Sequence, residues 1–233
     1  QVQSLYEGVT VTSSLVRNLI DFTDDEERCL LSKGVWYRYN DDYLNYLRDS
    51  IAEIKAEYDP QFDFSSKMHT DFVESFLSDA KKDPNNEGKS DDSIRADLKR
   101  KYYAERAFNM LMERDYGFEN YDRDSKSVND AKVEIMDLYK DKTMYAVKMG
   151  NTSAKLCYAV DQSIASLRLY KHHQLGNMPE IKTVEIWLVL DRTNHIEENG
   201  VPNINALEML MLKNRLDQWK KEVRLQGYTP LIR

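Results

Sequence analysis

Asp137 and Lys148 lie on two short apolar segments that are joined by the polar pair Asp141-Lys142. Side chains alternate between the two faces of a β-strand. A hairpin that turns at Asp141-Lys142 therefore places Asp137 opposite Ala146, and Lys148 follows two residues later on the same face. We expect the carboxylate and the ammonium group to converge, and a shift of one residue in the register would separate them.

This pair of side chains suits chemistry at a phosphate. A carboxylate can hold Mg²⁺ or Mn²⁺, which polarises a phosphate and lowers the pKa of a bound water. A nearby lysine can orient that water or stabilise developing negative charge. A second carboxylate normally helps to fix the metal, and its natural place, two residues before Lys148, is occupied by Ala146. Glu134 is expected to point to the other face of the first strand.

The segments around this pair predict a sheet that is covered by helices. Alternating apolar strands and helices indicate an α/β or α+β fold. The predicted strands are Lys132–Lys140, Thr143–Met149, Thr183–Leu190 and Thr229–Ile232. The predicted helices are Ile94–Arg114, Ser153–Tyr170 and Ile204–Leu225.

The first third of the chain predicts a separate α+β region. Residues 29–39 read as a strand pair broken at Lys33-Gly34, and a helix follows that Asn40 or Asp41 can cap. Residues 78–93 are almost wholly polar and predict an exposed loop. We expect this loop to divide an N-terminal region, residues 1–77, from a core, residues 94–233.

The composition of the chain limits the classes of protein to which it can belong. The chain has 233 residues, two cysteines, and a net charge of −7. Two cysteines are too few for a disulfide framework, and no apolar run is long enough for a membrane span, so we expect a cytoplasmic protein without membrane contact. The start, Gln1-Val2-Gln3-Ser4, resembles neither a signal peptide nor a natural initiator, and we expect a fragment of a longer protein.

The acidic net charge argues against a broad DNA-coating surface but leaves room for a local basic groove. Solvated helix faces are the competing interpretation for every candidate in that groove. The candidates are Lys99, Arg100, Lys101, Arg168 and Lys171. The stretch Asn151-Thr152-Ser153 follows Gly150 and resembles a helix N-cap, and the amide groups at such a helix start could also receive a phosphate.

The order helix, strand with Asp137, strand with Lys148, helix, strand resembles the restriction-endonuclease fold over roughly residues 94–190. The motif of that fold is a Pro-Asp step followed by Asp/Glu-x-Lys; Ala146 does not match the second acid, and no proline precedes Asp137. The resemblance implies that a glutamate of the preceding helix, Glu105, joins the site. It also implies a glutamine on the following helix, and Gln162 fits.

A second resemblance covers most of the chain. The chain is similar to the C-terminal part of a sporadically distributed, largely uncharacterised bacterial family that is associated with restriction and phage-defence genes. The matching stretches are GVWYRYNDDYLNYL, AERAFN, KVEIMDLY, MYAVKMGNTSAKL, AVDQ and LKNRLDQWKKEVRLQGYTPLIR. The family pattern has His-Val-Lys where this chain has Ala146-Val147-Lys148, and Ala159 or its neighbours replace a Ser-His pair.

These observations predict a restriction-endonuclease-like mixed sheet flanked by helices, with a metal-dependent nuclease site of a prokaryotic antiviral system acting on DNA. Asp137 with Glu105 or Glu134 would bind Mg²⁺ or Mn²⁺, and Lys148 would orient the attacking water. The partners implied are DNA, and a second copy of the chain or other defence subunits. The alternative is a catalytically impaired module of the same fold that binds nucleic acid or a partner protein. A purely structural domain is a third interpretation.

Overall fold

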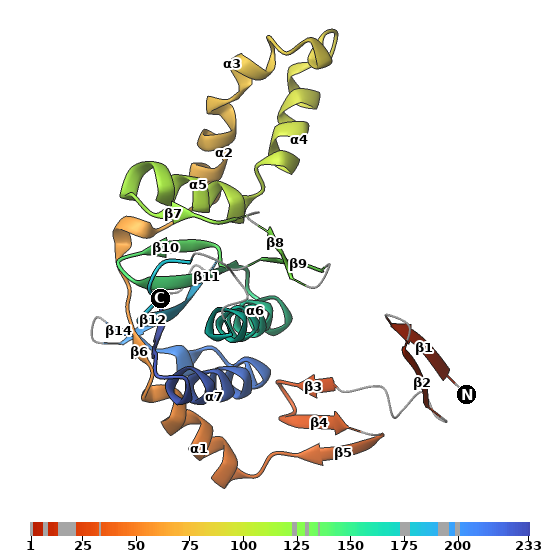
Figure 1. The fold of residues 1–233 in the computed structure, drawn as a ribbon, viewed down its shortest axis with the longest axis vertical. Coiled ribbons are helices and arrows are strands. Elements are labelled where there is room, and N and C mark those ends of the chain that lie inside the picture. The colour runs from red at the N-terminus through yellow and green to blue at the C-terminus, as the bar shows by residue number, and fades with distance from the viewer. Residues whose placement is uncertain are drawn as a thin grey trace.

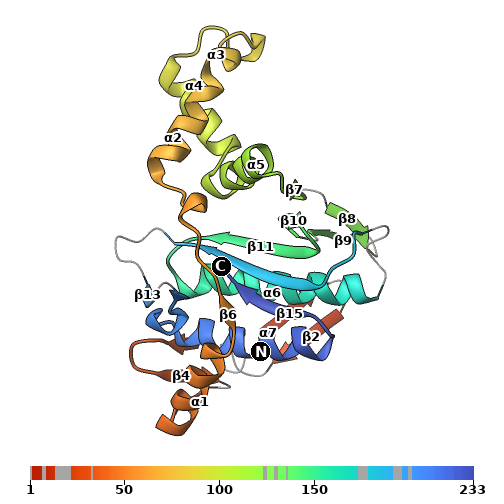
Figure 2. The same ribbon diagram turned by 90° about the vertical axis from the view of Figure 1, so that its left-hand side faces the viewer.

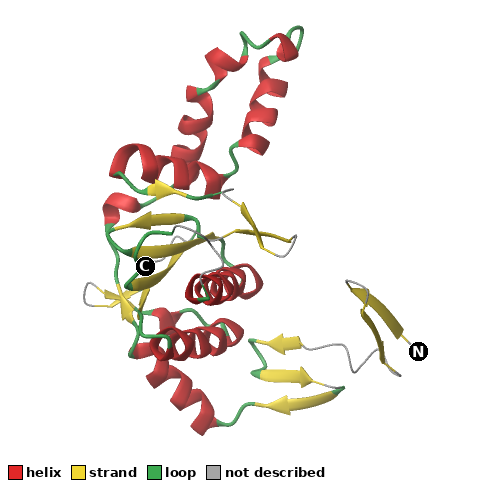
Figure 3. Ribbon diagram, in the orientation of Figure 1, coloured by secondary structure: helices red, strands yellow, loops and turns green. Residues whose placement is uncertain are grey.

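The computed structural model describes residues 2–6, 9–13, 22–32, 34–122, 125–128, 131–134, 136–172, 178–190, 196–198 and 201–233. Only the backbone is described for residues 2–6, 9–13, 22, 125–128 and 131–134. The described chain forms a mixed α/β structure around a six-stranded sheet (Figures 1 and 3).

The central sheet has the strand order β6-β15-β12-β11-β10-β7. Its first four strands are mutually parallel, whereas β10 and β7 each run antiparallel to their neighbours. The middle strands β11 and β12 are apolar along most of their length because helices cover both of their faces. The strand bounds are β6 Lys55–Ala56, β15 Thr229–Ile232, β12 Thr183–Val189, β11 Thr143–Met149, β10 Leu138–Lys140 and β7 Glu119–Asn120.

Two helices cover one face of the sheet, α6 (Ser153–Lys171) and α7 (Leu210–Leu225), and α1 (Asp41–Ala52) packs against α7 (Figure 2). Their apolar residues and those of β11 and β12 form one buried cluster, in which Trp219 is fully buried. The Trp219 indole N–H donates to the Ser163 hydroxyl at 3.1 Å, so the one polar atom of this large ring is satisfied.

The other face is covered by a single continuous segment, residues 57–118, which connects the two edge strands β6 and β7. Its helix α5 lies against the sheet, and α2, α3 and α4 extend outward as an arm (Figure 1). A second buried cluster, rich in aromatic rings, joins the arm to the sheet through Phe108 and Trp187. The helix bounds are α2 Ser66–Ser75, α3 Leu77–Ala80, α4 Asp91–Lys101 and α5 Ala104–Tyr116, with 3-10 turns at Pro60–Phe62 and Pro84–Asn86.

Smaller antiparallel sheets surround this core. A three-stranded sheet of β3, β4 and β5 contacts α7 through β3. The strands outside the central sheet are β1 Val2–Tyr6, β2 Val9–Ser13, β3 Phe22–Asp24, β4 Cys29–Ser32, β5 Val35–Arg38, β8 Ser125–Val128, β9 Ala131–Glu134, β13 Glu197–Glu198 and β14 Val201–Pro202, and a 3-10 turn spans Ile204–Ala206. None of the helices in the described part of the chain has the length and apolar character needed to cross a membrane.

Several sequence predictions are confirmed. The strand pair at 29–39, the helix capped by Asn40, and the strands Thr143–Met149 and Thr229–Ile232 are present with the expected bounds. The helix expected from Ser153 is also present and ends at Lys171.

Several predicted elements differ from the structure. The helix expected over Ile204–Leu225 begins at Leu210, after a 3-10 turn at Ile204–Ala206. The single helix expected over 94–114 is two helices, because Tyr102 leaves helical geometry and stacks on Phe76 with ring centres 4.5 Å apart. The loop expected over 78–93 contains the end of α3, a 3-10 turn and the start of α4. Residues 78–93 form the tip of the arm.

The central sheet also extends beyond the predicted core at 94–233, since β6 pairs with β15. Helix α1 likewise packs against α7. Residues 41–56 therefore contribute a strand and a helix to the layers built by the later part of the chain.

Candidate functional site

Lys148 lies near the end of β11, where the strand gives way to helix α6. Gly150 follows β11, and the Thr152 hydroxyl caps α6 by accepting a hydrogen bond from the Lys155 amide. This confirms the predicted cap and leaves Lys148 at the carboxyl end of a parallel strand, a common place for ligand sites in α/β sheets.

The hairpin that carries Asp137 and Lys148 has the predicted register. Asp141 and Lys142 form the turn with φ values of 48° and 63°, and Leu138 lies opposite Tyr145. The conformation is the one that twisted two-residue hairpins require. The same register places Asp137 opposite Ala146.

The prediction of one strand over Lys132–Lys140 is wrong, however. β9 ends at Glu134 and pairs with β8, whereas Asp137 lies in a bend before β10. Aspartate is a poor strand former because its side chain competes for backbone hydrogen bonds. Here its amide still donates to the Tyr145 carbonyl at 3.0 Å, while its carboxylate turns toward the neighbouring strand.

Two carboxylates cap the edge of β11 where β10 has ended. The Asp137 Oδ2 atom accepts a hydrogen bond from the Val147 amide at 2.7 Å, and Glu105 Oε2 accepts one from the Met149 amide at 3.0 Å. Backbone amides two residues apart point to the same side of a strand, so the two acids satisfy successive donors. Lys148 lies between these two positions.

Glu105 also pairs directly with Lys148. Glu105 lies in the first turn of α5, where the helix dipole favours an acid. Its Oε1 atom accepts a hydrogen bond from Lys148 Nζ at 2.9 Å, and the two side chains are 18% and 20% exposed. The structure thus brings Glu105, Asp137 and Lys148 to one place, as the sequence predicted.

The electrostatics of the three groups follow from their burial. Burial raises the pKa of Asp137 to about 7; the Val147 amide lowers it in part, and the charges of Glu105 and Asp122 raise it. Burial lowers the pKa of Lys148, but the hydrogen bond and charge of Glu105 outweigh burial, so the net shift of its pKa is upward. Lys148 therefore stays charged while Asp137 exchanges a proton near neutral pH.

Ala146 is buried in the cluster beneath α6, together with Leu156 and Val160. Its methyl group supplies no metal ligand and fills core space. Lys148, on the same face of β11, reaches the ring of Tyr158 on α6, with Nζ 4.9 Å from the ring centre. Gln162 is four residues further along α6 and shares the face of Tyr158. Tyr158 was not predicted from sequence, although helical spacing from Gln162 points to it.

The other predicted residues lie in different places. Ser153 donates a hydrogen bond to Asp25, and Asn151 is exposed before α6. Arg168 pairs with Glu222, and Lys171 donates to the Gln226 carbonyl. Lys171 is 18 residues beyond Ser153 in α6, or about 27 Å along the helix axis. The structure therefore does not bring Arg168 and Lys171 to Lys148.

Lys99, Arg100 and Lys101 are exposed in the last turn of α4, four to six residues before Glu105. Arg100 pairs with Asp97. Lys101 and Arg106 both lie over the Tyr102 ring, at 5.1 and 5.4 Å from its centre. Arg106 was not predicted, and nothing in its sequence context distinguishes it from a surface residue.

For Glu134 only the backbone, in β9, is described. His173 and Asp191 lie outside the described residues. Within the described ranges, no three His, Cys, Asp or Glu side chains gather into a group that could hold a metal ion.

Fold and site together define a mixed α/β protein in which two acids and a lysine meet at the end of a central parallel strand. The chain belongs to a family of unknown function, DUF6119, whose match covers residues 5–180. The match includes Glu105, Asp137, Lys148 and Tyr158 but ends before β12. No curated protein and no solved structure matches the chain.

Proposed function

We propose that this chain carries a restriction-endonuclease-like site for metal-dependent hydrolysis of phosphodiester bonds in DNA, in a prokaryotic defence system. The observation that carries the proposal is that Asp137 and Glu105 bind the Val147 and Met149 amides of β11, on either side of Lys148. The order α5, β10, β11, α6, β12 supports it, since it is the order of helix and strands expected for that fold.

The donor atoms suit Mg²⁺ or Mn²⁺. Both ions prefer carboxylate oxygens, and Mg²⁺ is commonly held by one or two carboxylates with water and substrate phosphate completing the shell. Asp137 and Glu105 supply two carboxylates, and Ala146 supplies none. A bound ion polarises the phosphate and acidifies a water. Lys148, held in place by Glu105, stabilises negative charge on the phosphate.

A basic patch beside these acids supports nucleic acid as the substrate. Lys99, Lys101 and Arg106 lie at the junction of α4 and α5, next to Glu105 in sequence. The positive side chains at this junction give a chain of negative net charge a local basic surface. Such a surface can contact the phosphates of the DNA backbone. Both Lys101 and Arg106 contact the Tyr102 ring, which anchors them at this junction.

A second candidate function is a nucleic-acid-binding module that has lost catalysis. The observation that favours it is Ala146, buried where the motif has its second acid. Such a module would keep the basic junction of α4 and α5 and bind DNA without cutting it.

A cleavage assay separates these functions. Plasmid, linear and single-stranded DNA and RNA are incubated with Mn²⁺ or Mg²⁺ and wild-type protein, Lys148→Ala, Lys148→Arg, or the control Lys82→Ala at the arm tip. The nuclease proposal expects cleavage that both Lys148 variants reduce at least about a hundredfold and that Lys82→Ala leaves intact. Thermal melts verify that each variant is folded.

Wild type that retains DNA in a low-salt gel shift but does not cleave would overturn the nuclease and favour the binding module. That module further expects Lys101→Ala with Arg106→Ala to weaken retention. Neither cleavage nor retention would overturn both functions.

A further inference from the structure

A cavity of about 680 Å³ opens at the carboxyl ends of the parallel strands β6, β15 and β12. Glu57, Arg233 and Val189 mark these three strand ends in its wall. Cavities of this size hold small organic molecules, and this edge of a parallel sheet is where α/β proteins bind ligands. Lys148, Asp137 and Glu105 do not line it, so it is separate from the candidate nuclease site.

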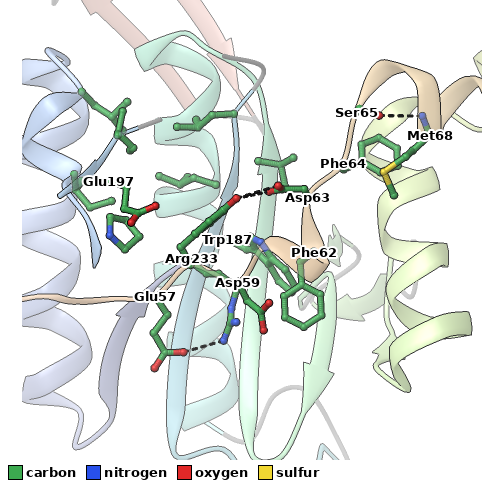
Figure 4. Close-up of a pocket in the computed structure, with 18 of the residues that line it drawn as sticks. Glu57, Asp59, Phe62, Asp63, Phe64, Ser65, Met68, Trp187, Glu197 and Arg233 are labelled. Atoms are coloured by element: carbon green, nitrogen blue, oxygen red, sulfur yellow. Dashed lines mark hydrogen bonds and ion pairs between the residues drawn. The ribbon is translucent and has the colours of Figure 1, made fainter. Parts of the chain in front are cut away.

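The floor of the cavity is aromatic and apolar. Trp187 and Phe62 pack edge to face with ring centres 5.1 Å apart, and Leu188 and Leu207 extend the apolar surface. Figure 4 shows both rings beside Arg233. A ligand that fills this space must carry an apolar body.

Arg233 does not make the cavity basic. Its Nε atom donates to Glu185 at 2.6 Å, and its Nη2 atom donates to Glu57 at 3.0 Å. Lys67, the other cation of the wall, pairs with Asp71 at 2.6 Å. Both positive charges are therefore balanced by acids of the protein itself.

The polar part of the wall is acidic. Asp59, Asp63 and Glu197 line the cavity, and in Figure 4 Glu197 and Asp63 stand on opposite sides of it. The hydrogen bond to Asp63 raises the pKa of the Tyr58 hydroxyl, and the charges of Asp63, Glu197 and Asp59 raise it further, so all three acids act on the same region. Glu57 already pairs with Arg233, so these three further acids leave the wall with an excess of negative charge, which disfavours a phosphate or carboxylate ligand.

A metal ion does not explain these acids, since among the described residues no three acidic, His or Cys groups are close enough to hold one. Arg233 already lies over the Phe62 and Trp187 rings, with its guanidinium carbon 5.5 and 5.2 Å from their centres. Separated acids around a largely apolar wall suit a larger cation, whose charge faces the acids and whose body contacts the apolar side chains. We propose that this cavity binds an organic cation, an amine or guanidine attached to an aromatic or aliphatic body. This site does not depend on the nuclease proposal.

Two probes with the same ring and opposite charge test the site, phenethylamine and 3-phenylpropionate. Binding is followed by the indole N–H signal of Trp187 in ¹H–¹⁵N NMR spectra of the full chain, assigned with Trp187→Phe. The amine is expected to shift this signal with an affinity at least about tenfold above that of the acid. The indole signal of buried Trp219 serves as an internal reference that stays in place.

Rim variants then locate the charge. Asp63→Asn and Glu197→Gln are each expected to weaken amine binding about threefold or more, while Glu198→Gln, the neighbour of Glu197 that does not line the cavity, leaves it unchanged. Equal affinities for the two probes, no shift of Trp187 with the amine, or rim variants that bind the amine like wild type would each overturn the proposal.

Discussion

The Asp137 carboxylate accepts a hydrogen bond of 2.7 Å from the Val147 amide, so a side chain ten residues earlier completes the edge of β11 where β10 stops. A carbonyl oxygen of a longer β10 would otherwise satisfy this amide. The acid that the sequence offers for chemistry thus also has a structural task, and variants at the site must be interpreted with both in mind.

Asp137→Asn is expected to change how stability depends on pH. The carboxyl titrates near pH 4 in the unfolded chain and at about 7 in the folded protein. Between these values the folded state holds more protons at Asp137, so the contribution of this carboxyl to the free energy of unfolding falls as the pH rises from 4 to 7 and then levels. Asparagine keeps an acceptor for Val147 but does not titrate.

Relative to Asp137→Asn, wild type should therefore lose on the order of a few kcal/mol of unfolding free energy between pH 4.5 and pH 8. Urea unfolding in EDTA measures it. A difference that stays constant over this range would contradict the buried, protonated carboxyl.

Lys148 and Glu105 should be energetically coupled. A double-mutant cycle with Lys148→Met and Glu105→Gln is expected to give a coupling free energy of about 1–2 kcal/mol, because the pair is mostly buried and hydrogen-bonded. Urea unfolding of the four proteins supplies the cycle. The exposed pair Lys82 and Asp79 is the matched control and should give less than about 0.5 kcal/mol. Equal coupling in both pairs would show that Glu105 does not hold Lys148.

The turn between β10 and β11 should be improved by glycine. Lys142 has a φ of 63°, a backbone conformation that is energetically unfavourable for any residue with a Cβ atom. Lys142→Gly is expected to be about 0.5–1 kcal/mol more stable than Lys142→Ala. Both variants lose the same exposed pair with Glu180, so the comparison isolates the backbone. Thermal unfolding measures it, and an alanine variant as stable as the glycine variant would refute it.

Trp219 and Trp36 should respond very differently to the same substitution. Trp219→Phe removes the hydrogen bond to Ser163 and leaves space in the core, which should cost about 1–3 kcal/mol. Trp36 is 57% exposed on β5, and Trp36→Phe should stay within about 0.5 kcal/mol of wild type. Chemical unfolding of the two variants checks this, and similar losses would mean that β5 is covered in solution.

Elements whose structure depends on local residue patterns could be predicted from the sequence. The turn at Asp141-Lys142 and the register that follows from it could be predicted because a two-residue turn fixes which residues face each other. The cap at Thr152 and the strand Thr143–Met149 likewise follow from residue type and spacing. The hairpin register predicted that Asp137 and Lys148 converge, and the resemblance to the restriction-endonuclease fold added Glu105 to the same site.

Other features depend on contacts between distant segments. The break at Tyr102 arises because its ring stacks on Phe76, 26 residues away, and no local pattern marks it. The bend at Asp137 arises because its carboxylate binds the next strand. The cavity near Trp187 brings together β6, β12, β15 and the segment after β6, so its acids were not recognisable as a group.

The segment 57–118 leaves the sheet at one edge strand and returns at the other, with the arm between them. A cut at the arm tip, near Pro84, would therefore yield two fragments that each carry one edge of the sheet. The earlier fragment would retain β6 and α2, and the later one would retain their partners β15 and α5. The fold is thus arranged for fragment complementation, in which two separately made pieces reassemble along the β6–β15 strand pair and several helical interfaces, α1 with α7 and α2 with α5 among them.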